Sequence, residues 1–415
     1  MRVLVIGNGA REHALCWKLK QSPLLTELFC APGNPGIAAV ADRVPIAPEE
    51  VPRLADFATE MRIDLTVVGP ELPLTLGIAD EFAGRGLPIF GPTQRAAEIE
   101  GSKVFSKLFM DRHQIPTAPF AVAHDAAAAL AEAKRFGLPV VLKADGLAAG
   151  KGVLIATTEE ELVEAVRTLF EERRFGASAD RVVVEAFLPG DEVSFMALCD
   201  GERVLPLATA RDYKRIGDGD TGPNTGGMGA HSPSGGLSAE TAAEGRPFVG
   251  VLYAGLMLTP EGPRVLEFNA RFGDPEAQVL LMRLEDDLLP LLAAGAAGRF
   301  DTRRLSFRRE AAACVVLASP GYPGRPRTGE PIRGLDRAGA VEGVEIFHAG
   351  TTVEGGELVS AGGRVLSVCA LASDLRGALE RAYAAVGEVD WPGKVYRHDV
   401  GRRLLDPDQG GVTGP

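Results

Sequence analysis

The stretch VVLKADGLAAGKGV, residues 140–153, decides how this chain folds. Its apolar start predicts a buried strand that delivers Lys143, then a loop of small residues, then a second strand near Val153. Gly and Ala let backbone N–H groups approach phosphate oxygens closely. We therefore expect a phosphate-binding loop between two strands, with Lys143, Gly146 and Lys151 as its candidate contacts.

Two other interpretations explain this loop less well. A P-loop needs Ser or Thr directly after its lysine and joins a strand to a helix, whereas Gly152 follows Lys151 here. A plain hairpin with a solvated lysine explains neither the length of the loop nor the lysine that ends an apolar run.

The residues around the loop predict a small separate lobe. Its expected elements are helix 125–136, strand 139–143, strand 152–156, helix 158–173 and strand 181–185. Thr158 and Glu161 have the spacing of a capping box at the start of the second helix.

The lobe ends in VVVEAFLPGDE, residues 182–192, where a strand runs into a hinge-like segment. Such a segment, here Phe187 and Leu188, can offer backbone groups to the edge of an adenine. Glu192 is our candidate for ribose hydroxyls. Glu185 is either a further nucleotide contact or a solvated strand end.

Upstream, residues 1–101 alternate short apolar runs with helical stretches. The expected strands are 2–6, 28–31, 64–68 and 88–90, and the expected helices are 11–20, 49–60 and 74–85. This rhythm predicts a parallel sheet with helices on both faces. Ligands of such sheets bind beyond the carboxyl ends of the strands. The glycine-bearing loops 7–9, 33–36 and 69–71 are therefore candidate ligand contacts.

The first of these loops opens the motif GNGARE, residues 7–12, which is not a dinucleotide fingerprint. The third glycine of that fingerprint is replaced by Glu12, and no acid stands at the end of the second strand, residues 28–31. What remains is either a tight turn or a general anion site at a helix start, suited to one phosphate.

Downstream, VLEFNARFGDPE, residues 265–276, alternates apolar and polar side chains. Glu267, Asn269 and Arg271 therefore share one face of a strand. Carboxylate and amide oxygens suit Mg²⁺, which also binds nucleotide phosphates, and Arg271 can clamp a carboxylate. The alternative is the polar outer face of an edge strand.

Residues 211–229, RDYKRIGDGDTGPNTGGMG, are too rich in glycine for a stable helix or strand. A loop that holds Asp212, Lys214 and Arg215 beside several glycines suits a small zwitterion and a phosphate. The other expected elements are strands 192–199, 249–258 and 264–268, helices 102–113, 286–297 and 374–387, and short strands within 308–403.

Composition excludes several classes of protein. The 415 residues suffice for two to four domains, and 46% hydrophobic with 24% charged residues fits a globular chain. A net charge of −12 argues against nucleic acid as a partner. No apolar stretch approaches the roughly 20 residues of a membrane span, and the five scattered cysteines indicate reduced thiols. We expect a cytoplasmic protein that binds small molecules and neither nucleic acid nor membrane.

Together these stretches resemble the phosphoribosylamine–glycine ligases, also called glycinamide ribonucleotide synthetases, of the ATP-grasp superfamily. The resemblance runs from VLVIGNGAREHAL and APGNPG through VGPELPL, FGPT, EGSK and KADGLAAGKGV. It continues in DYKRIGDGDTGPNTGGMGA and VLEFNARFGDPE, which are the most specific stretches, and ends in FHAGT and SAGGRVL.

The resemblance implies an α/β chain with the ATP-grasp fold. An N-terminal parallel-sheet substrate domain would span residues 1–101. The ATP-grasp domain would span 102–305, with a mobile lid at about 117–188, and an α+β cap would span 308–403.

The resemblance also implies which residues bind each ligand. ATP is expected at Lys103, Lys143, Glu185 and Glu192, beside Gly146, Lys151, Phe187 and Leu188. Mg²⁺ or Mn²⁺ is expected at Glu267 and Asn269. Glycine is expected at Asp212, Arg271, Gly273 and Asp274, and 5-phosphoribosylamine at Gly9, Glu12, Glu71 and Lys214. Catalysis is expected to rest on Lys143, Arg271 and Asp212.

The implied reaction joins glycine to 5-phosphoribosylamine through a glycyl phosphate, with ATP giving ADP and phosphate. We expect a monomer whose partners are these small molecules. Two alternatives stay open: another ATP-grasp carboxylate–amine ligase or a carboxylase, and a non-catalytic nucleotide-sensing module. The chain departs from its relatives between Ser232 and Phe248, where they are longer, and at Ala10, where they often have glycine.

Overall fold

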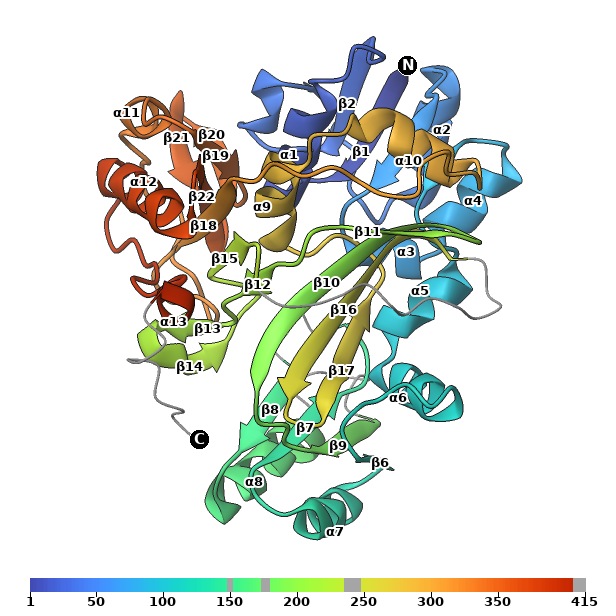
Figure 1. Ribbon diagram of the computed structural model, residues 1–415, viewed down its shortest axis with the longest axis vertical. Helices are drawn as coiled ribbons and strands as arrows, with labels where there is room; N and C mark the ends of the chain where they lie inside the picture. The colour runs from blue at the N-terminus through green and yellow to red at the C-terminus, as the bar shows by residue number, and fades with distance from the viewer. Residues whose placement is uncertain (148–151, 173–179, 235–247, 406–415) are drawn as a thin grey trace.

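The structure, a computed structural model, describes residues 1–147, 152–172, 180–234 and 248–405. Figure 1 shows the N-terminal region at the top, a small lobe at the bottom, a central sheet between them and the C-terminal region at the left. Within the described ranges, every helix is too short or too polar to cross a bilayer. All five cysteines are buried and free, as expected for reduced thiols.

The N-terminal sheet is parallel and confirms the rhythm read from residues 1–101. Its strands, in sheet order, are β3 (Asp42–Arg43), β2 (Glu27–Pro32), β1 (Arg2–Gly7), β4 (Leu65–Val68) and β5 (Ile89–Phe90). Helix α1 (Ala10–Leu19) covers one face, and α2 (Val51–Glu60) and α4 (Ile78–Gly84) cover the other. Residues 3–6 of β1 alternate between these two cores, so all four of these residues are apolar.

The helix expected at 74–85 is instead two helices, α3 (Glu71–Thr75) and α4. They are separated by Gly77, whose φ of 85° lies in the left-handed region that glycine adopts without strain. An unexpected helix, α5 (Gln94–Gly101), precedes the expected α6 (Lys103–Arg112).

The small lobe is a four-stranded antiparallel sheet with two helices on one face. Its strands, in sheet order, are β6 (Phe120–Ala123), β9 (Val182–Ala186), β7 (Val140–Ala144) and β8 (Val153–Ala156). Helices α7 (Ala126–Phe136) and α8 (Glu159–Val166) pack on it. The Thr158 hydroxyl caps α8 by accepting from the Glu161 N–H at 3.2 Å, while the Glu161 carboxylate accepts from the Thr157 N–H at 2.8 Å.

The central sheet is antiparallel and carries long strands. In sheet order these are β11 (Val204–Pro206), β10 (Asp191–Asp200), β16 (Val249–Thr259) and β17 (Gly262–Asn269). Helices α9 (Glu276–Arg283) and α10 (Leu288–Ala296) follow β17. Helix α9 was not expected, because all eight of its residues are buried and it therefore lacks the one-sided apolar stripe of a surface helix.

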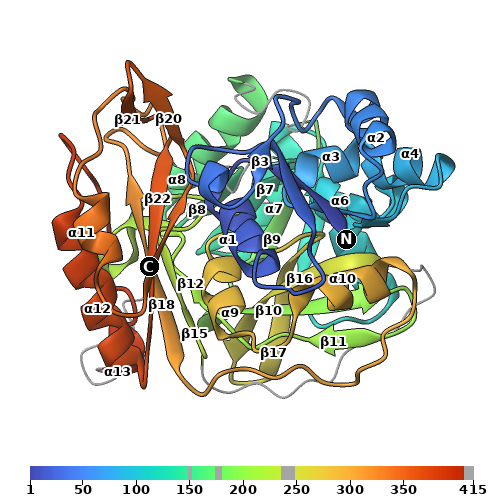
Figure 2. The same ribbon diagram turned by 90° about the horizontal axis from the view of Figure 1, so that it is seen from above.

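The C-terminal sheet takes one of its five strands from within the glycine-rich segment 211–229, and another begins at the last residue of that segment, Gly229. In sheet order the strands are β12 (Arg211–Asp212), β15 (Gly229–Ser232), β18 (Ala311–Ala318), β22 (Arg364–Ala372) and β19 (Val344–His348). Helix α12 (Leu375–Glu388) covers this sheet, and Figure 2 shows it on the far side from α1. The smaller elements here are β20 (Thr351–Glu354), β21 (Glu357–Ser360), α11 (Leu335–Gly339) and α13 (Arg402–Leu405).

The expectation that residues 211–229 form no strand was therefore wrong. Besides β12, the segment contains the paired strands β13 (Arg215–Gly217) and β14 (Thr221–Asn224). The backbone pairing of β12 and β15 with each other, and of β15 with β18, supplies order that the local sequence does not specify.

Candidate active site

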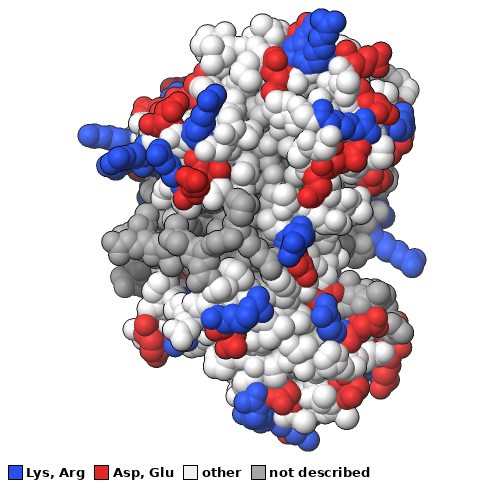
Figure 3. Space-filling view, turned by 90° about the vertical axis from the view of Figure 1, so that its right-hand side faces the viewer, with Lys and Arg blue, Asp and Glu red and all other residues white. Residues whose placement is uncertain are grey.

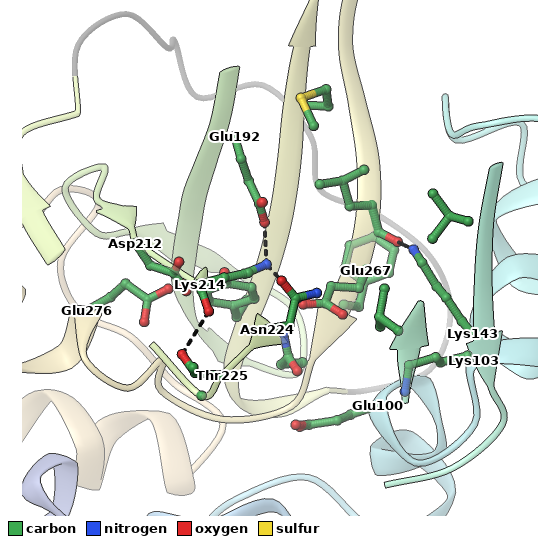
Figure 4. A pocket seen from close by; sticks show the side chains of 18 of the residues that line it. Glu100, Lys103, Lys143, Glu192, Asp212, Lys214, Asn224, Thr225, Glu267 and Glu276 are labelled. Atoms are coloured by element: carbon green, nitrogen blue, oxygen red, sulfur yellow. Dashed lines mark hydrogen bonds and ion pairs between the residues drawn. The ribbon is translucent and has the colours of Figure 1, made fainter. Parts of the chain in front are cut away.

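A cavity of about 980 Å³ lies between the N-terminal region, the lobe, the central sheet and the C-terminal region. Figure 4 looks into this cavity: Lys103 and Lys143 point inwards from one side, and Asp212, Lys214 and Glu276 from the other. The cavity therefore brings together side chains from every region of the chain.

Two predicted lysines lie at the lobe end of the cavity. Lys143, in β7, forms an ion pair with Glu185 of the neighbouring strand β9 and donates to the Leu266 carbonyl at 3.2 Å. Lys103, the first residue of α6, donates to the Gly146 carbonyl at 3.0 Å. The two ammonium groups line one side of the cavity and can bind phosphate oxygens there.

Lys107 is a third lysine of this group, and it was not among the predicted site residues. Its Nζ lies 2.5 Å from Glu185 Oε2 and donates to Thr117 Oγ1 at 2.7 Å. Burial, with the nearby Lys143 charge, lowers the pKa of Lys107 to about 8. Glu185 is only 2% exposed, so the alternative of a solvated strand end is wrong. The available signal was spacing, because Lys107 follows Lys103 by one helical turn.

The segment after β9 lines the cavity beside these lysines. Phe187, Leu188 and Glu192 are all lining residues, as a nucleoside site requires. Glu192 forms an ion pair with Lys214, so a ribose hydroxyl would share its carboxylate with that lysine.

The two predicted metal ligands follow each other on one face of β17. Glu267 and Asn269 both line the cavity, opposite Gly255 and Tyr253 of β16. Burial alone would raise the pKa of Glu267, but Lys214, Lys143 and Lys103 overcome it and lower the pKa to about 2. An ionised carboxylate beside an amide oxygen, next to lysines that can bind phosphates, fits a hard divalent cation held jointly with a nucleotide.

Arg271 lies at the junction of β17 and the N-terminal region. Its guanidinium contacts Glu100 at 3.0 Å and Glu71 at 3.5 Å, and donates to the Phe272 carbonyl at 3.2 Å. Glu100 was not among the predicted site residues, and burial raises its pKa. A substrate carboxylate at Arg271 would therefore share it with two protein carboxylates.

The helix start at α1 is occupied by the protein's own carboxylate. Glu12 accepts from the Gly9 N–H at 2.6 Å and pairs with Arg11 at 2.6 Å. A Cβ on Gly7 or Gly69 would lie under 3 Å from the Glu12 side chain, which explains both glycines. A phosphate at this helix start would have to displace Glu12 or bind beside it. Glu12 and Glu71 are both acidic residues of the cavity lining.

Asp212 lies next to Glu276 on the far side of the cavity (Figure 4). Glu276 accepts from the Ser194 hydroxyl at 2.8 Å, and that hydroxyl lies 3.1 Å from the Tyr253 hydroxyl. Burial raises the pKa of Asp212 well above its usual value, and Glu276, Glu192 and Glu267 act in the same direction against Lys214. A cationic ligand group beside these acids would keep Asp212 ionised.

The structure brings most of the predicted residues to the cavity. Lining residues among them are Gly9, Glu12, Glu71, Lys103, Lys143, Glu185, Phe187, Leu188, Glu192, Asp212, Lys214, Glu267, Asn269, Arg271 and Asp274. Gly146 accepts a hydrogen bond from Lys103 through its carbonyl, and Gly273 lies against the Glu276 carboxylate. Lys151 and nearly all of the short 232–248 segment lie outside the described residues. Arg11, Glu100, Lys107, Tyr253, Glu276 and Arg364 also line the cavity and were not predicted.

One predicted loop does not reach the cavity. Asn34, in the loop after β2, donates to the carbonyls of Asn8 at 2.9 Å and of His348 at 2.7 Å. This loop therefore joins the N-terminal region to the C-terminal region.

Comparison with known proteins adds family relationships. Three domain descriptions match in order: the N domain of phosphoribosylglycinamide synthetase at residues 1–100, its ATP-grasp (A) domain at 101–277 and its C domain at 312–403. A phosphoribosylamine–glycine ligase of Brucella melitensis is 48% identical over 99% of both chains. One from Mesorhizobium japonicum is 50% identical over 97% of this chain and 98% of its own.

Solved structures agree with these matches. The phosphoribosylamine–glycine ligase of Thermotoga maritima superimposes with a TM-score of 0.80 at 34% identity, over 96% of this chain and 100% of its own. The biotin carboxylase domain of the Hydrogenobacter thermophilus 2-oxoglutarate carboxylase gives a TM-score of 0.74 at 19% identity, over 99% of this chain and 94% of its own. The second likeness is one of fold alone, and it supports the ATP-grasp fold.

Proposed function

This chain belongs to the phosphoribosylglycinamide synthetase family and is an ATP-dependent phosphoribosylamine–glycine ligase of purine biosynthesis. We propose that its cavity carries out this reaction with ATP at one end and the acceptor substrates at the other. The family uses ATP with a divalent metal ion. The observation that carries the proposal is that one cavity is lined by two lysines (Lys103 and Lys143), two side chains with hard oxygen atoms (Glu267 and Asn269) and Arg271.

We assign the lobe end of the cavity to ATP. Lys103 and Lys143 would bind its phosphates, and Phe187, Leu188 and Glu192 would surround its nucleoside. Glu267 and Asn269 would hold Mg²⁺, or Mn²⁺, together with phosphate oxygens. The bound ion would neutralise the phosphate charge that otherwise repels an incoming carboxylate.

We assign the opposite end to the acceptor substrates. Arg271 would orient the carboxylate of glycine towards the γ-phosphate, and Asp212 would receive its ammonium group. Attack of that carboxylate gives ADP and glycyl phosphate. The nitrogen of 5-phosphoribosylamine then attacks the acyl carbon, and inorganic phosphate leaves. Gly9, Glu12, Glu71 and Lys214 are the proposed contacts of the phosphoribosylamine. Here the protein acts by positioning and charge neutralisation and needs no covalent nucleophile.

Isotope transfer tests the acyl-phosphate route. A free carboxylate is a poor electrophile because its oxygen is a poor leaving group, and phosphorylation turns that oxygen into a good one. Glycine labelled with ¹⁸O in its carboxylate should pass one labelled oxygen into the released phosphate. Unlabelled phosphate, or AMP and pyrophosphate as products, would contradict this route.

Substrate omission tests the choice of acceptors. ADP release should require both glycine and 5-phosphoribosylamine, and bicarbonate should not replace glycine. ADP release that depends on bicarbonate would point to a carboxylase instead.

We further infer a monomer in the cytoplasm. The small-molecule substrates and the five buried free thiols support the cytoplasmic location. Figure 3 shows acidic and basic side chains interspersed on one face of the molecule, which supports the monomer. Light scattering during gel filtration would contradict a monomer if the mass were a multiple of 43.7 kDa.

A further inference from the structure

The C-terminal region contributes Arg364 and Arg403 to the lining of the cavity. Arg364, the first residue of β22, is a lining residue although its strand belongs to the C-terminal sheet. Its guanidinium donates to the Gly226 carbonyl at 2.7 Å, to the Asp274 carbonyl at 2.8 Å and to Asp274 Oδ2 at 2.9 Å. One arginine thus ties two separate cavity segments to the C-terminal region.

Tyr322 holds the other side of the same glycine. Its hydroxyl accepts from the Gly226 N–H at 3.0 Å, so both backbone groups of Gly226 are bound by the C-terminal region. The fit is close, because a Cβ on Gly226 would lie 3.1 Å from Arg364 Cζ. A Cβ on Gly363 would lie 2.3 Å from the Tyr322 ring, so glycine is required there as well.

The clamped glycine is connected to Lys214. Thr225, the residue before Gly226, donates to the Lys214 carbonyl through its N–H and through its hydroxyl, each at 2.8 Å. Lys214 in turn pairs with Glu192 and lies 3.5 Å from Glu267 (Figure 4). Moving Gly226 would therefore move the main chain that carries Lys214.

The carboxylate of Asp274 is held on both oxygens. Oδ2 accepts from Arg364, and Oδ1 accepts from Gln278 of α9 at 2.8 Å. Burial would raise the pKa of Asp274, but Arg364, together with Arg11, Arg271 and the hydrogen bond from Gln278, outweighs burial and lowers that pKa. A Cβ on Gly9 would lie 3.8 Å from Asp274 Oδ2, so this carboxylate stands where the N-terminal and C-terminal regions meet.

From these contacts we propose that Arg364 and Tyr322 are positioning residues of the ligase reaction. They fix Gly226 and Asp274, and through Thr225 they set the place of Lys214 at the acceptor end of the cavity. The inference rests on the proposed function, because it assigns these residues to the acceptor substrates and not to ATP. The C-terminal region then contributes to substrate affinity in addition to covering the cavity.

Steady-state kinetics of Tyr322→Phe, Arg364→Met and the double variant test the proposal. Arg364→Met should raise the KM for glycine and for 5-phosphoribosylamine about tenfold, the effect of about one charge-assisted hydrogen bond. The KM for ATP should stay within about twofold, because in the described part of the chain Arg364 forms its hydrogen bonds with Gly226 and Asp274 and none with Lys103, Lys143 or Glu185. Arg364→Lys should lie between wild type and Arg364→Met, since an ammonium lacks the fork that reaches three acceptors.

The double variant separates a shared clamp from two unrelated contacts. Both residues hold Gly226. The KM values of the double variant for glycine and 5-phosphoribosylamine should therefore exceed those of Arg364→Met by no more than about twofold. The proposal would be overturned if the KM increases of the two single variants multiplied in the double variant. Equal rises in all three KM values, or unchanged KM values in every variant, would also overturn it. Tyr322→Phe removes a single hydroxyl and keeps the test informative if Arg364→Met does not fold.

Arg337→Met is the matched control. Arg337 pairs with Glu388 at 2.6 Å on the surface of the C-terminal region, away from the cavity lining. The KM values of the Arg337→Met variant should equal those of wild type. A wild-type enzyme without glycine-dependent ADP release would refute the proposed function itself, whereas an active wild type with unaffected variants would refute only this inference.

Discussion

At the scale of single residues, the charge of Glu267 is set by its neighbours. Three lysines around it hold its pKa near 2 against the effect of burial, so the carboxylate is ionised at any pH used for an assay. Two of these lysines, Lys103 and Lys143, are the candidates for binding the phosphates of ATP. Removal of the Glu267 charge should therefore disturb the metal and the nucleotide together.

Glu267→Gln keeps the shape of the side chain and removes its charge. Turnover should fall at least about a hundredfold, the usual cost of losing one electrostatic stabiliser of a transition state. The measurement is ADP release across a titration of magnesium. Glu261→Gln, in the turn of the same hairpin, is exposed and should keep full activity. Near-normal activity of Glu267→Gln at low magnesium would show that the metal assignment is wrong.

Lys143→Ala tests the nucleotide end of the cavity. The substitution should weaken ATP binding by about 1.5–3 kcal/mol, the range of a hydrogen bond to a charged group. Lys107 would still neutralise Glu185, so the fold should survive. Calorimetric titration with ATP measures the effect, and Lys134→Ala on the exposed side of α7 is the control. Unchanged affinity would remove Lys143 from the nucleotide site.

At the scale of elements, a buried arginine is one of the residues that anchor the hairpin of β13 and β14. Arg397, 1% exposed, pairs with Asp220 at 2.7 Å and with Asp399 at 2.6 Å. It also donates to the Arg215 carbonyl at 3.3 Å. Figure 1 shows the hairpin beside α13 at the edge of the C-terminal region. A glycine-rich hairpin with little core of its own is thus anchored by ion pairs to the chain after α12.

Arg397→Ala should lower the free energy of unfolding by about 3 kcal/mol, the lower end of the cost of breaking a buried ion pair. The lower end applies because Asp220 is partly exposed. Urea denaturation measures the change. Arg337→Ala, which breaks an exposed pair, should cost no more than about 1 kcal/mol. If the two variants lost equal stability, Arg397 would not be an anchor.

At the scale of the whole molecule, α1 packs against β19 through two neutral histidines. The His348 N–H donates to His13 Nδ1 at 2.8 Å, and His348 Nδ1 lies 3.1 Å from Thr351 Oγ1. Burial lowers the pKa of His13 to about 3, helped by His348, and lowers the pKa of His348 to about 4. The contact between the N-terminal and C-terminal regions therefore requires both rings to stay uncharged.

This contact makes stability depend on pH in a defined direction. Both histidines titrate at about 6.5 when unfolded, so the unfolded chain binds more protons as pH falls below about 6.5. Stability is therefore lost on acidification, by about 2 kcal/mol for His13 alone at pH 5. The Tm of wild type should fall between pH 7.5 and pH 5 more steeply than the Tm of His13→Gln, whose amide oxygen can still accept from His348. Equal slopes would contradict this account.

The fold class could be predicted from the sequence alone, and most of the site residues predicted in this way line the cavity. Strands such as β1 and β17 show their burial in the order of apolar residues, because a strand turns alternate side chains to opposite faces. Lys143, Glu267 and Asn269 could be predicted because each stands at a fixed place on such a strand. The motifs around them are local, so no long-range contact was needed to recognise them.

Which charges are paired, and which residues join distant regions, became visible only in the folded chain. Lys107, Glu100 and Arg364 stand in ordinary helix and strand patterns, and their roles arise from partners that are remote in sequence or in another sheet. Helix α9 was hidden because it is buried on all sides. Strands β12 and β15 were hidden because their pairing comes from the C-terminal sheet. Sequence patterns report the local periodicity of burial, whereas ion pairs and sheet edges depend on packing between segments that only the folded chain brings together.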